Sequence, residues 1–571
     1  MTIEEKYALW LDSATEDGDL TAELTAIAGQ PDEIRDRFYR ELEFGTGGLR
    51  GVIGAGENRL NIYTARKATQ GLANYLKEKY AESAVAISYD SRIKSDYFAR
   101  EAARVLAAAG IKVYLFPQLE PTPVLSYAVR YYGCQAGIMI TASHNPAKYN
   151  GYKCYGADGC QMTDDDANAV TACIRRLDIF RDVQVADYAA ALAEGRIVLV
   201  DDALLESFYE QVLAQQIHPG VCREAGLKVI YTPLNGTGNL PVREVLKRIG
   251  AADVTVVPEQ ELPDGNFPTA PYPNPEIRQA FECALKLAET VKPDLLLATD
   301  PDCDRVGIAV REGGDYVLMS GNEVGCLLLD YIIAGRQAAG TMPADPVVVK
   351  TIVTSNLAAA IAEKYGCELR NVLTGFKYIG EQIGLLEQAG HPERYLMGFE
   401  ESYGYLAGTY VRDKDAVVAA MLITEMAAYY RTQGVSLLER MRALYKEYGY
   451  YAHSLLNCTF EGEQGMITMG RLMDGLRAEP PAEIGGLKVL SCADYWEKVQ
   501  TDMLTGETVA LTLPRSNVLA YTLEQNASVI VRPSGTEPKI KAYITATGKD
   551  AQAANGLGDT LKAAMEELLK G

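Results

Sequence analysis

The sequence predicts an α/β protein made of several domains, and two observations support this fold class. Strand-like and helix-like patterns alternate, as in a strand over residues 84–88, a helix over 95–110 and a second strand over 111–116. The chain has 571 residues, which is too long for one hydrophobic core, so we expect three to five domains. Its 48% hydrophobic and 23% charged residues are ordinary for a globular protein.

The same order of elements recurs in the middle of the chain. A strand over residues 227–231 precedes a helix over 241–249 and a strand over 253–257. A further strand over residues 347–351 precedes a helix over 356–365. This repetition favours α/β layers over separate all-α and all-β regions.

The C-terminal segment has strand patterns over residues 528–532 and 540–545, and it closes with an amphipathic helix over 551–569. Short linkers are expected near residues 200–202, 313–321 and 448–455. These linkers give the following predicted domains: 1–203, 204–320, 321–450 and 451–571.

The net charge restricts the partners that the protein can have. A formal charge of −21 argues against nucleic acid and anionic membranes, because both require clustered lysine and arginine. An anionic small substrate would instead require a local cationic pocket within the acidic protein. No coiled-coil or interface pattern distinguishes a monomer from a dimer.

Three further observations favour a cytoplasmic location. The 11 cysteines include no Cys-x-x-Cys pair and are expected to be reduced thiols. Residues 1–19 are acidic and do not resemble a signal peptide. The longest apolar stretch, residues 417–430, is interrupted by Glu425 and is too short to span a membrane.

Three apolar runs each end in a polar loop, and the first loop contains Ser143. The run over residues 137–140 is followed by Thr141-Ala-Ser143-His144-Asn145-Pro, with Lys153 ten residues beyond the serine. A serine that follows a buried strand can be a nucleophile or a phosphate carrier. The alternative is a Ser/Asn/Pro turn that caps a helix. No Gly-x-Ser-x-Gly motif frames Ser143, so hydrolase chemistry has little support.

The second loop, after residues 295–298, contains Asp300, Asp302 and Asp304. On an extended backbone these alternating residues would point to one side, and three close carboxylates require a cation, for which Mg²⁺ is expected. An EF-hand is excluded because its sixth and twelfth positions are Arg305 and Arg311 here. A solvated acidic turn remains the alternative, although the adjacent Arg305 suits phosphate binding.

The third loop follows residues 395–397 and contains Glu400, Glu401 and Ser402, which could bind vicinal sugar hydroxyls. Taken alone this is a weak signal, since acidic pairs are common on solvated surfaces. Ligand sites of α/β proteins lie beyond the carboxyl ends of strands, so we expect the three loops to converge on one cleft.

A fourth motif lies near the C-terminus. The segment Arg532-Pro-Ser534-Gly535-Thr536-Glu-Pro-Lys539 offers a guanidinium, two hydroxyls and amides around a glycine. These groups suit a phosphate, although a Pro-Gly turn between strands is the alternative.

With these motifs in this order between Phe44 and Lys539, the sequence resembles the α-D-phosphohexomutase family of phosphoglucomutases and phosphomannomutases. The resemblance implies three similar α/β domains and a smaller C-terminal α+β domain around a central cleft. It implies that Ser143 carries a phosphoryl group, against which the three aspartates hold Mg²⁺. Lys153 is the candidate general acid or base and His144 supports it, with the division between them left open.

The resemblance also implies further substrate contacts. Arg50, in the glycine-rich segment 45–51, would lie beside the serine. Thr374, Lys377 and Lys414 match segments that contact the sugar phosphate. With Lys153, Arg305 and Arg532, these cations would form the pocket that an anionic substrate requires.

The expected reaction converts glucose 1-phosphate to glucose 6-phosphate through a glucose 1,6-bisphosphate intermediate, since the Glu-Glu-Ser-Tyr form of the sugar loop is closer to phosphoglucomutases. Phosphomannomutase, phosphopentomutase and sugar-bisphosphate synthase activities remain alternatives. So do a metal phosphatase and a non-catalytic phosphosugar-binding protein.

Overall fold

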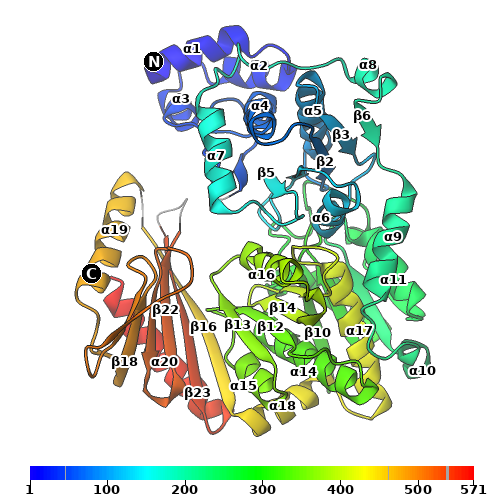
Figure 1. Cartoon of the computed structure of the whole chain (residues 1–571), viewed down its shortest axis with the longest axis vertical. Coiled ribbons are helices and arrows are strands. Elements are labelled where there is room, and N and C mark those ends of the chain that lie inside the picture. The colour runs from blue at the N-terminus through cyan, green and yellow to red at the C-terminus, as the bar shows by residue number, and fades with distance from the viewer. Residues whose placement is uncertain (46, 461, 535–538, 571) are drawn as a thin grey trace.

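Four β-sheets follow one another along the chain in the computed structural model (Figure 1), which describes residues 1–45, 47–460, 462–534 and 539–570. Helices alternate with the strands of the first three sheets, whereas the fourth sheet is a continuous antiparallel array. The predicted α/β fold class with a distinct C-terminal domain is therefore confirmed.

The first sheet has six strands, of which the buried β4 and β2 form the centre. In spatial order the strands are β1 (Gly48–Val52), β5 (Tyr149–Gly156), β4 (Ala136–Ile140), β2 (Ala84–Tyr89), β3 (Lys112–Leu115) and β6 (Ile197–Leu199). The helices of this region are α1 (Ile3–Ser13), α2 (Gly18–Ala26), α3 (Pro31–Phe38), α4 (Ile62–Lys79), α5 (Ser95–Ala108), α6 (Thr122–Tyr131), α7 (Asp164–Arg175), α8 (Tyr188–Ala193), α9 (Asp202–Leu213) and α10 (Val221–Ala225).

The second sheet has five strands, and every residue of its central strand β9 is buried. In spatial order they are β11 (Asp315–Met319), β10 (Val306–Glu312), β9 (Leu295–Thr299), β7 (Lys228–Thr232) and β8 (Asp253–Val256). The helices are α11 (Asn239–Arg248), α12 (Pro258–Glu261), η1 (Arg278–Phe281) and α13 (Glu282–Val291).

The third sheet has four strands, in the order β13 (Glu368–Val372), β12 (Val347–Thr351), β14 (Tyr395–Glu400) and β15 (Gly404–Ala407). Its helices are α14 (Gly321–Ala339), α15 (Leu357–Lys364), α16 (Phe376–Gln388), η2 (Pro392–Arg394), α17 (Ala416–Thr432) and α18 (Leu437–Tyr448). The long α14 begins at a capping box between Ser320 and Glu323 and ends at Gly340 in the left-handed conformation. Both features are local sequence signals for the limits of a helix.

The fourth sheet carries a helix layer of its own. Its strands are β16 (Tyr450–Thr459), β23 (Lys539–Gly548), β22 (Ser528–Pro533), β21 (Leu519–Leu523), β18 (Leu487–Asp494), β19 (Val499–Asp502) and β20 (Thr508–Ala510), with β17 (Glu483–Ile484) paired to β18. The other elements are α19 (Gly462–Ala478), η3 (Glu524–Asn526) and α20 (Ala551–Leu568).

The first three sheets contain the same topological unit. Two parallel strands joined through a helix are followed by a third parallel strand, which then turns back into an antiparallel neighbour. The spatial order is β5-β4-β2-β3 in the first sheet, β10-β9-β7-β8 in the second and β15-β14-β12-β13 in the third. The loop between the last two strands of each unit is one of the three polar loops noted in the sequence.

Each of these three loops contains one non-glycine residue in the left-handed region. The residues are Ser143 with a φ of 52°, Cys303 with 51° and Tyr403 with 65°. This conformation is unfavourable for residues other than glycine, and such residues concentrate at functional sites. This backbone conformation, which the three loops share, lets the chain reverse direction within a few residues in each loop.

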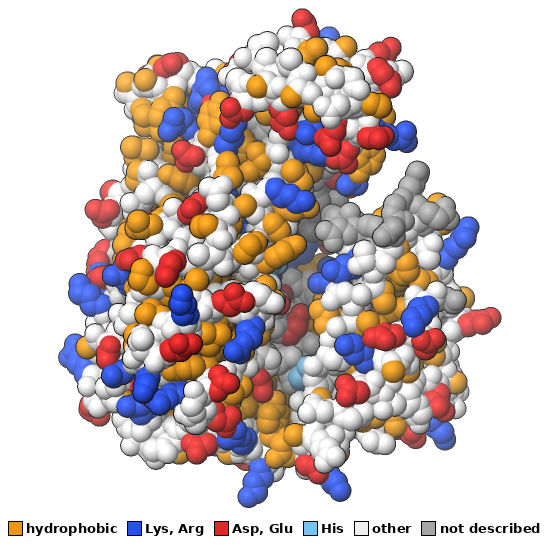
Figure 2. Space-filling view, turned by 180° about the vertical axis from the view of Figure 1, so that it is seen from behind, with side chains coloured by type: hydrophobic (Ala, Val, Ile, Leu, Met, Phe, Trp, Pro, Cys, Tyr) orange, Lys and Arg blue, Asp and Glu red, His pale blue; other side chains and the backbone are white. Residues whose placement is uncertain are grey.

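The hydrophobic cores differ between the first three domains and the fourth. The buried helix α17 packs against α10, α11 and β9, and one core cluster continues from the first domain through the second and third. The fourth sheet and α20 enclose a separate core. Figure 2 shows a deep groove between the lobe of the fourth sheet and the rest of the molecule.

Two of the predicted linkers were wrong. Residues 315–319 form the edge strand β11, paired with β10, and β16 begins at Tyr450 and pairs along β23. Both strands are partly exposed. The domain limits themselves stay a prediction.

Two predictions about the whole chain can be compared with the structure. All 11 cysteines are free, and nine of them are buried. Within the described ranges, none of the helices has the length and apolar character needed to cross a bilayer.

Candidate active site

Ser143 lies at the end of the buried strand β4, in the turn that leads to β5. The residue is 3% exposed, its amide donates to the Thr141 hydroxyl at 2.8 Å, and its carbonyl accepts from Arg92. The Ser143 hydroxyl lies 3.2 Å from His144 Nδ1. Both backbone polar groups of Ser143 therefore have hydrogen-bond partners, the amide within the loop and the carbonyl at Arg92, which follows β2.

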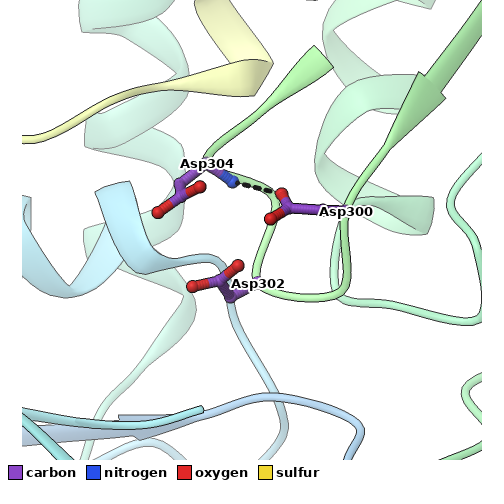
Figure 3. A group of neighbouring side chains, drawn as sticks. All are labelled: Asp300, Asp302 and Asp304. Atoms are coloured by element: carbon purple, nitrogen blue, oxygen red, sulfur yellow. Dashed lines mark hydrogen bonds between the residues drawn. The ribbon is translucent and has the colours of Figure 1, made fainter. Parts of the chain in front are cut away.

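The three aspartates converge through a turn and not through an extended strand. Figure 3 shows Asp300, Asp302 and Asp304 around one small volume, with the Asp304 amide donating to Asp300 Oδ1 at 3.1 Å. The Arg305 amide donates to the same oxygen, and the Cys303 amide donates to the Asp300 carbonyl. The expected convergence is present, but the extended backbone proposed for it was wrong.

The aspartate cluster fits a hard cation. One oxygen from each side chain lies within 4.8 Å of the others, and the three residues are at most 1% exposed. Among the described residues, Asp302 Oδ1 and Asp304 Oδ1 are buried without a hydrogen-bond partner. Buried carboxylate oxygens without partners are costly, and coordination of a divalent cation such as Mg²⁺ would satisfy them.

The second oxygen of each of these two carboxylates has a cationic partner. Lys153 Nζ lies 2.8 Å from Asp302 Oδ2 and 3.6 Å from Asp304 Oδ2. Lys414 Nζ lies 3.1 Å from Asp304 Oδ2 and the same distance from Asp413 Oδ1. In the described part of the chain, each of these two carboxylates thus has one oxygen paired with lysine and one oxygen without a hydrogen bond, although Arg305 Nε lies 3.8 Å from Asp304 Oδ1.

The serine and metal loops meet across two domains. The Ser143 hydroxyl donates to Asp300 Oδ2 at 2.9 Å. Thr122, the first residue of α6, donates from its hydroxyl to Asp302 Oδ2 at 3.0 Å and from its amide to the Asp302 carbonyl. These contacts place the serine hydroxyl at the cation site.

The charges of the site shift the ionisation of its members. Burial, together with Asp302 and Asp304, raises the pKa of Asp300 well above its ordinary value. Burial acts in the same direction on Asp302, but Lys153, Asp300 and Lys414 together outweigh it and lower the pKa of Asp302. Burial and the nearby Arg305 and Arg50 lower the pKa of His144 well below its ordinary value, so its imidazole is neutral at pH 7.

Glu400 is the buried member of the sugar loop. It is 7% exposed and accepts from the Gly375 amide at 2.9 Å. Burial raises the pKa of Glu400 to about 7, with Lys414 opposing the rise. Glu401 points away, toward the hydroxyls of Thr351 and Thr354. Ser402 and Thr374 are both partly exposed beside this loop.

Lys377 is tied to the first domain. Its ammonium lies 2.6 Å from Asp164 Oδ1, at the first residue of α7, and the Lys377 carbonyl accepts from the Cys160 thiol. The predicted phosphate ligand therefore has a carboxylate partner from another domain, which a substrate phosphate would have to replace.

Two predicted arginines lie at the rim of the aspartate site. Arg305 pairs with Glu276 at 2.6 Å. Arg50 is exposed on β1, opposite Gly151 of β5, two residues before Lys153. Both arginines are close enough to His144 to lower its pKa.

Arg532 faces the sugar loop from the fourth domain. It is half-buried on β22, opposite Lys541 of β23. Burial raises the pKa of Tyr543 to about 12, and the Tyr543 side chain is influenced by both Glu401 and Arg532. The Ser534 amide donates to the Lys539 carbonyl at 2.7 Å. The predicted ligands Gly535 and Thr536 lie outside the described residues.

Sequence reasoning missed Thr122, Asp164, Asp90 and Arg92, which contact the predicted loops. They lie in Pro-Thr, Asp-Asp and Asp-Ser-Arg segments that resemble ordinary turns and helix starts. The signal that could have found Asp90 and Arg92 is their place after β2, the strand that neighbours β4.

Family models match the chain in four consecutive segments. They are described as Phosphoglucomutase/phosphomannomutase, alpha/beta/alpha domains I, II and III and the C-terminal domain, and they match residues 41–179, 206–314, 320–448 and 498–562.

Among curated relatives, the phosphoglucomutase of Staphylococcus haemolyticus is 37% identical over 509 residues, which cover 89% of this chain and 91% of that protein. The phosphoglucomutase of Staphylococcus saprophyticus is 36% identical over 539 residues, which cover 94% of this chain and 96% of that protein.

Two solved structures share the fold. Paramecium parafusin, a phosphoglucomutase in an open form, matches with a TM-score of 0.68 at 17% identity, covering 93% of this chain and 96% of that chain. A phosphoglucomutase/phosphomannomutase family protein of Burkholderia thailandensis matches with a TM-score of 0.66 at 18% identity, covering 92% and 98%.

Proposed function

The chain belongs to the phosphoglucomutase/phosphomannomutase family, and on this premise we propose that it interconverts glucose 1-phosphate and glucose 6-phosphate. The observation that carries the proposal is the hydrogen bond from the Ser143 hydroxyl to Asp300, inside a cluster of buried carboxylates. A phosphoryl group on this oxygen would lie next to the site that fits a cation.

Asp300, Asp302 and Asp304 would hold Mg²⁺, with an oxygen of the phosphoserine as a further ligand. When bound, the ion supplies charge neutralisation for the phosphoryl oxygens. The residues do the remaining work: Lys153 and Lys414 limit the negative charge of the aspartate cluster, and Thr122 fixes the orientation of Asp302.

In the forward direction, the free 6-hydroxyl of glucose 1-phosphate attacks the phosphorus on Ser143. The bond between phosphorus and the Ser143 oxygen breaks, and the product is glucose 1,6-bisphosphate. The hydroxyl proton is accepted by neutral His144, which then passes a proton to the released serine oxygen, or by Lys153 once its ammonium has given a proton to that oxygen. Because His144 Nδ1 lies 3.2 Å from the serine oxygen, His144 is our candidate for that return.

The bisphosphate then reorients, and its 1-phosphate returns to Ser143. In each half-reaction the other phosphate requires a binding site away from the serine. Arg532, Ser534, Gly535 and Thr536 are proposed for this role, with Lys377 and Thr374 from the third domain and Arg50 and Arg305 at the rim. Glu400 and Ser402 are proposed to bind sugar hydroxyls. The separate core of the fourth domain suits a part that opens without releasing the intermediate.

Within the family, the identity of the sugar follows from the curated relatives, which are named phosphoglucomutases. Mannose and pentose phosphates, and bisphosphate synthesis, are the competing activities on the same residues. A comparison of kcat/KM for glucose, mannose and pentose 1-phosphates tests the choice, and a preference for either competitor would overturn it.

Replacing Ser143 with alanine tests the carrier role. We expect turnover in the presence of glucose 1,6-bisphosphate to fall by about 10³-fold or more, because the phosphoryl acceptor is removed. Intact-mass measurement should detect one phosphate on the wild-type protein, mapped to Ser143. The control is Ser126→Ala, since Ser126 is a buried serine of α6 that bonds only backbone groups. Near-normal turnover of Ser143→Ala would refute the mechanism, and release of inorganic phosphate alone would indicate a phosphatase.

A further inference from the structure

Arg92 and Asp90 fix the backbone of the serine loop, and we propose that Arg92 is a positioning residue for phosphoryl transfer at Ser143. The inference rests on the proposed function, because it assigns a role in the same reaction. Neither residue belongs to a motif noted above, and neither reaches the aspartate cluster through a hydrogen bond in the described part of the chain.

The Arg92 side chain is enclosed by the serine loop. Its guanidinium donates to the backbone carbonyls of Ser143 and Asn145 through Nη2, and to those of Pro146 and Tyr149 through Nη1. The residue is 3% exposed. One planar cation thus binds four carbonyl groups of the serine loop at once.

Asp90 connects Arg92 to the other side of Ser143. Asp90 Oδ2 accepts from the Thr141 hydroxyl at 2.6 Å and lies 3.3 Å from Arg92 Nε. The Thr141 oxygen in turn accepts from the Ser143 amide. Asp90 Oδ1 accepts from the Arg92 amide and from the Ser95 hydroxyl. The Asp90 carboxylate is therefore linked to the Ser143 amide through Thr141 and to the Ser143 carbonyl through Arg92.

This double attachment matters because Ser143 has a φ of 52°. The left-handed region is unfavourable for a non-glycine residue, which stays in it only where its surroundings hold it. At Ser143 the Asp90–Arg92 pair supplies that support, and the resulting kink directs the hydroxyl to Asp300. A relaxed loop would move the phosphoryl carrier away from the cation site.

The second domain supports Arg92 from behind. The guanidinium carbon lies 5.0 Å from the centre of the Phe267 ring, and Phe267 is fully buried. A β-carbon added at Gly265 would come within 2.5 Å of the Ile93 amide nitrogen, so the two segments are in close backbone contact. Arg92 therefore links the serine loop to the domain that carries Asp300, Asp302 and Asp304.

Lysine cannot replace this arginine, since a single ammonium cannot reach four carbonyls spread along the loop. We expect Arg92→Lys to lower kcat by about 10²-fold, which is the effect of misplacing a reacting group by about 1 Å. The KM for glucose 1-phosphate should change little, and phosphorylation of Ser143 by glucose 1,6-bisphosphate, followed by intact mass, should slow in parallel with kcat.

The matched control is Arg66→Lys. Arg66 is also buried in the first domain, pairs with Glu101 and lies over the ring of Tyr63, but among the described residues it makes no hydrogen bond or ion pair with the serine loop. An equal loss of kcat in both variants, or an unchanged kcat in Arg92→Lys, would overturn the inference. A selective loss with similar Tm values supports it.

Phe267→Leu provides a second route if Arg92→Lys does not fold. This variant removes the ring behind the guanidinium and leaves every hydrogen bond of Arg92 in place. We expect a smaller, several-fold loss of kcat with an unchanged KM, and an unaltered kcat would refute the role of the second domain. Absence of phosphate on wild-type Ser143 would instead refute the proposed function itself.

Discussion

Ser143 and the three aspartates are almost fully buried and contact each other across two domains, whereas Arg532 is half-buried on a domain with its own core. The first region is held by many short contacts, among them those of Thr122, Lys153 and Arg92. Lys377, on the same side as Arg532, has one carboxylate partner from another domain. The reacting oxygen is therefore more deeply enclosed than the Arg532 side chain.

This difference follows from the proposed reaction. Phosphoryl transfer requires a preorganised electrostatic site, because little covalent work is left to the protein. The bound sugar must present two different oxygens to one serine, so its far end has to be held in two orientations. A rigid serine end and a movable phosphate end divide these requirements between the domains.

The largest effect should come from breaking the rigid end at its metal loop. Asp302→Asn removes the negative charge of this carboxylate, whose Oδ1 has no hydrogen bond among the described residues and whose Oδ2 pairs with Lys153. We expect kcat to fall by about 10²- to 10³-fold, since a catalytic metal supplies several kcal/mol. Activity measured against Mg²⁺ concentration checks this, with Asp315→Asn in the exposed strand β11 as the control. An unchanged Mg²⁺ dependence would remove Asp302 from the site.

The next prediction concerns the burial of Glu400 in the sugar loop. Burial raises the pKa of Glu400 to about 7, so the folded protein keeps a proton that the unfolded chain loses above about pH 4.5. The contribution of Glu400 to the free energy of unfolding is therefore lost as the pH rises from about 4.5 to 7. Relative to Glu400→Gln, the wild type should lose up to about 3 kcal/mol across that interval. The gap in Tm between the two proteins should widen from pH 5 to pH 8, and a constant gap would contradict the burial of this charge.

The smallest effect is expected at the movable end. Arg532→Ala should raise the KM for glucose 1-phosphate about tenfold or more with kcat altered only a few-fold, because a charge-assisted phosphate contact is lost without disturbing Ser143. Steady-state kinetics measures both constants. Arg515→Ala is the control, as Arg515 lies over Trp496 on the exposed side of the same domain. If kcat falls instead of KM rising, the contrast between the two ends is wrong.

Short local patterns were enough to locate the three loops that carry Ser143, the aspartates and the glutamates, because each loop follows a buried strand and carries its polar groups within a few residues; the roles of these residues stay a prediction. The aspartates illustrate the limit of such reasoning. Their spacing indicated convergence, but the structure achieves it with a turn at Cys303 and backbone amides bound to Asp300. Spacing constrains which side chains meet, and the backbone path depends on the surrounding fold.

The supporting residues could not be predicted, since their partners are far away in the sequence. Thr122 reaches Asp302 across 180 positions, and Lys377 reaches Asp164 across 213. No periodicity encodes such pairs. The edge strand β11 was also missed, although Tyr316 to Met319 form a short apolar run.

The unit shared by the first three sheets gives the chain interchangeable parts. Each copy presents one loop at the same position, and the three loops carry the serine, the aspartates or the glutamates. The segment over residues 400–403, which includes Glu400, could therefore be exchanged with that of a relative as a cassette, since the described hydrogen bonds of the Ser143 hydroxyl involve only Asp300 and His144. Changes in the sugar loop would then alter the range of substrates, and changes in the serine and aspartate loops would alter phosphoryl transfer.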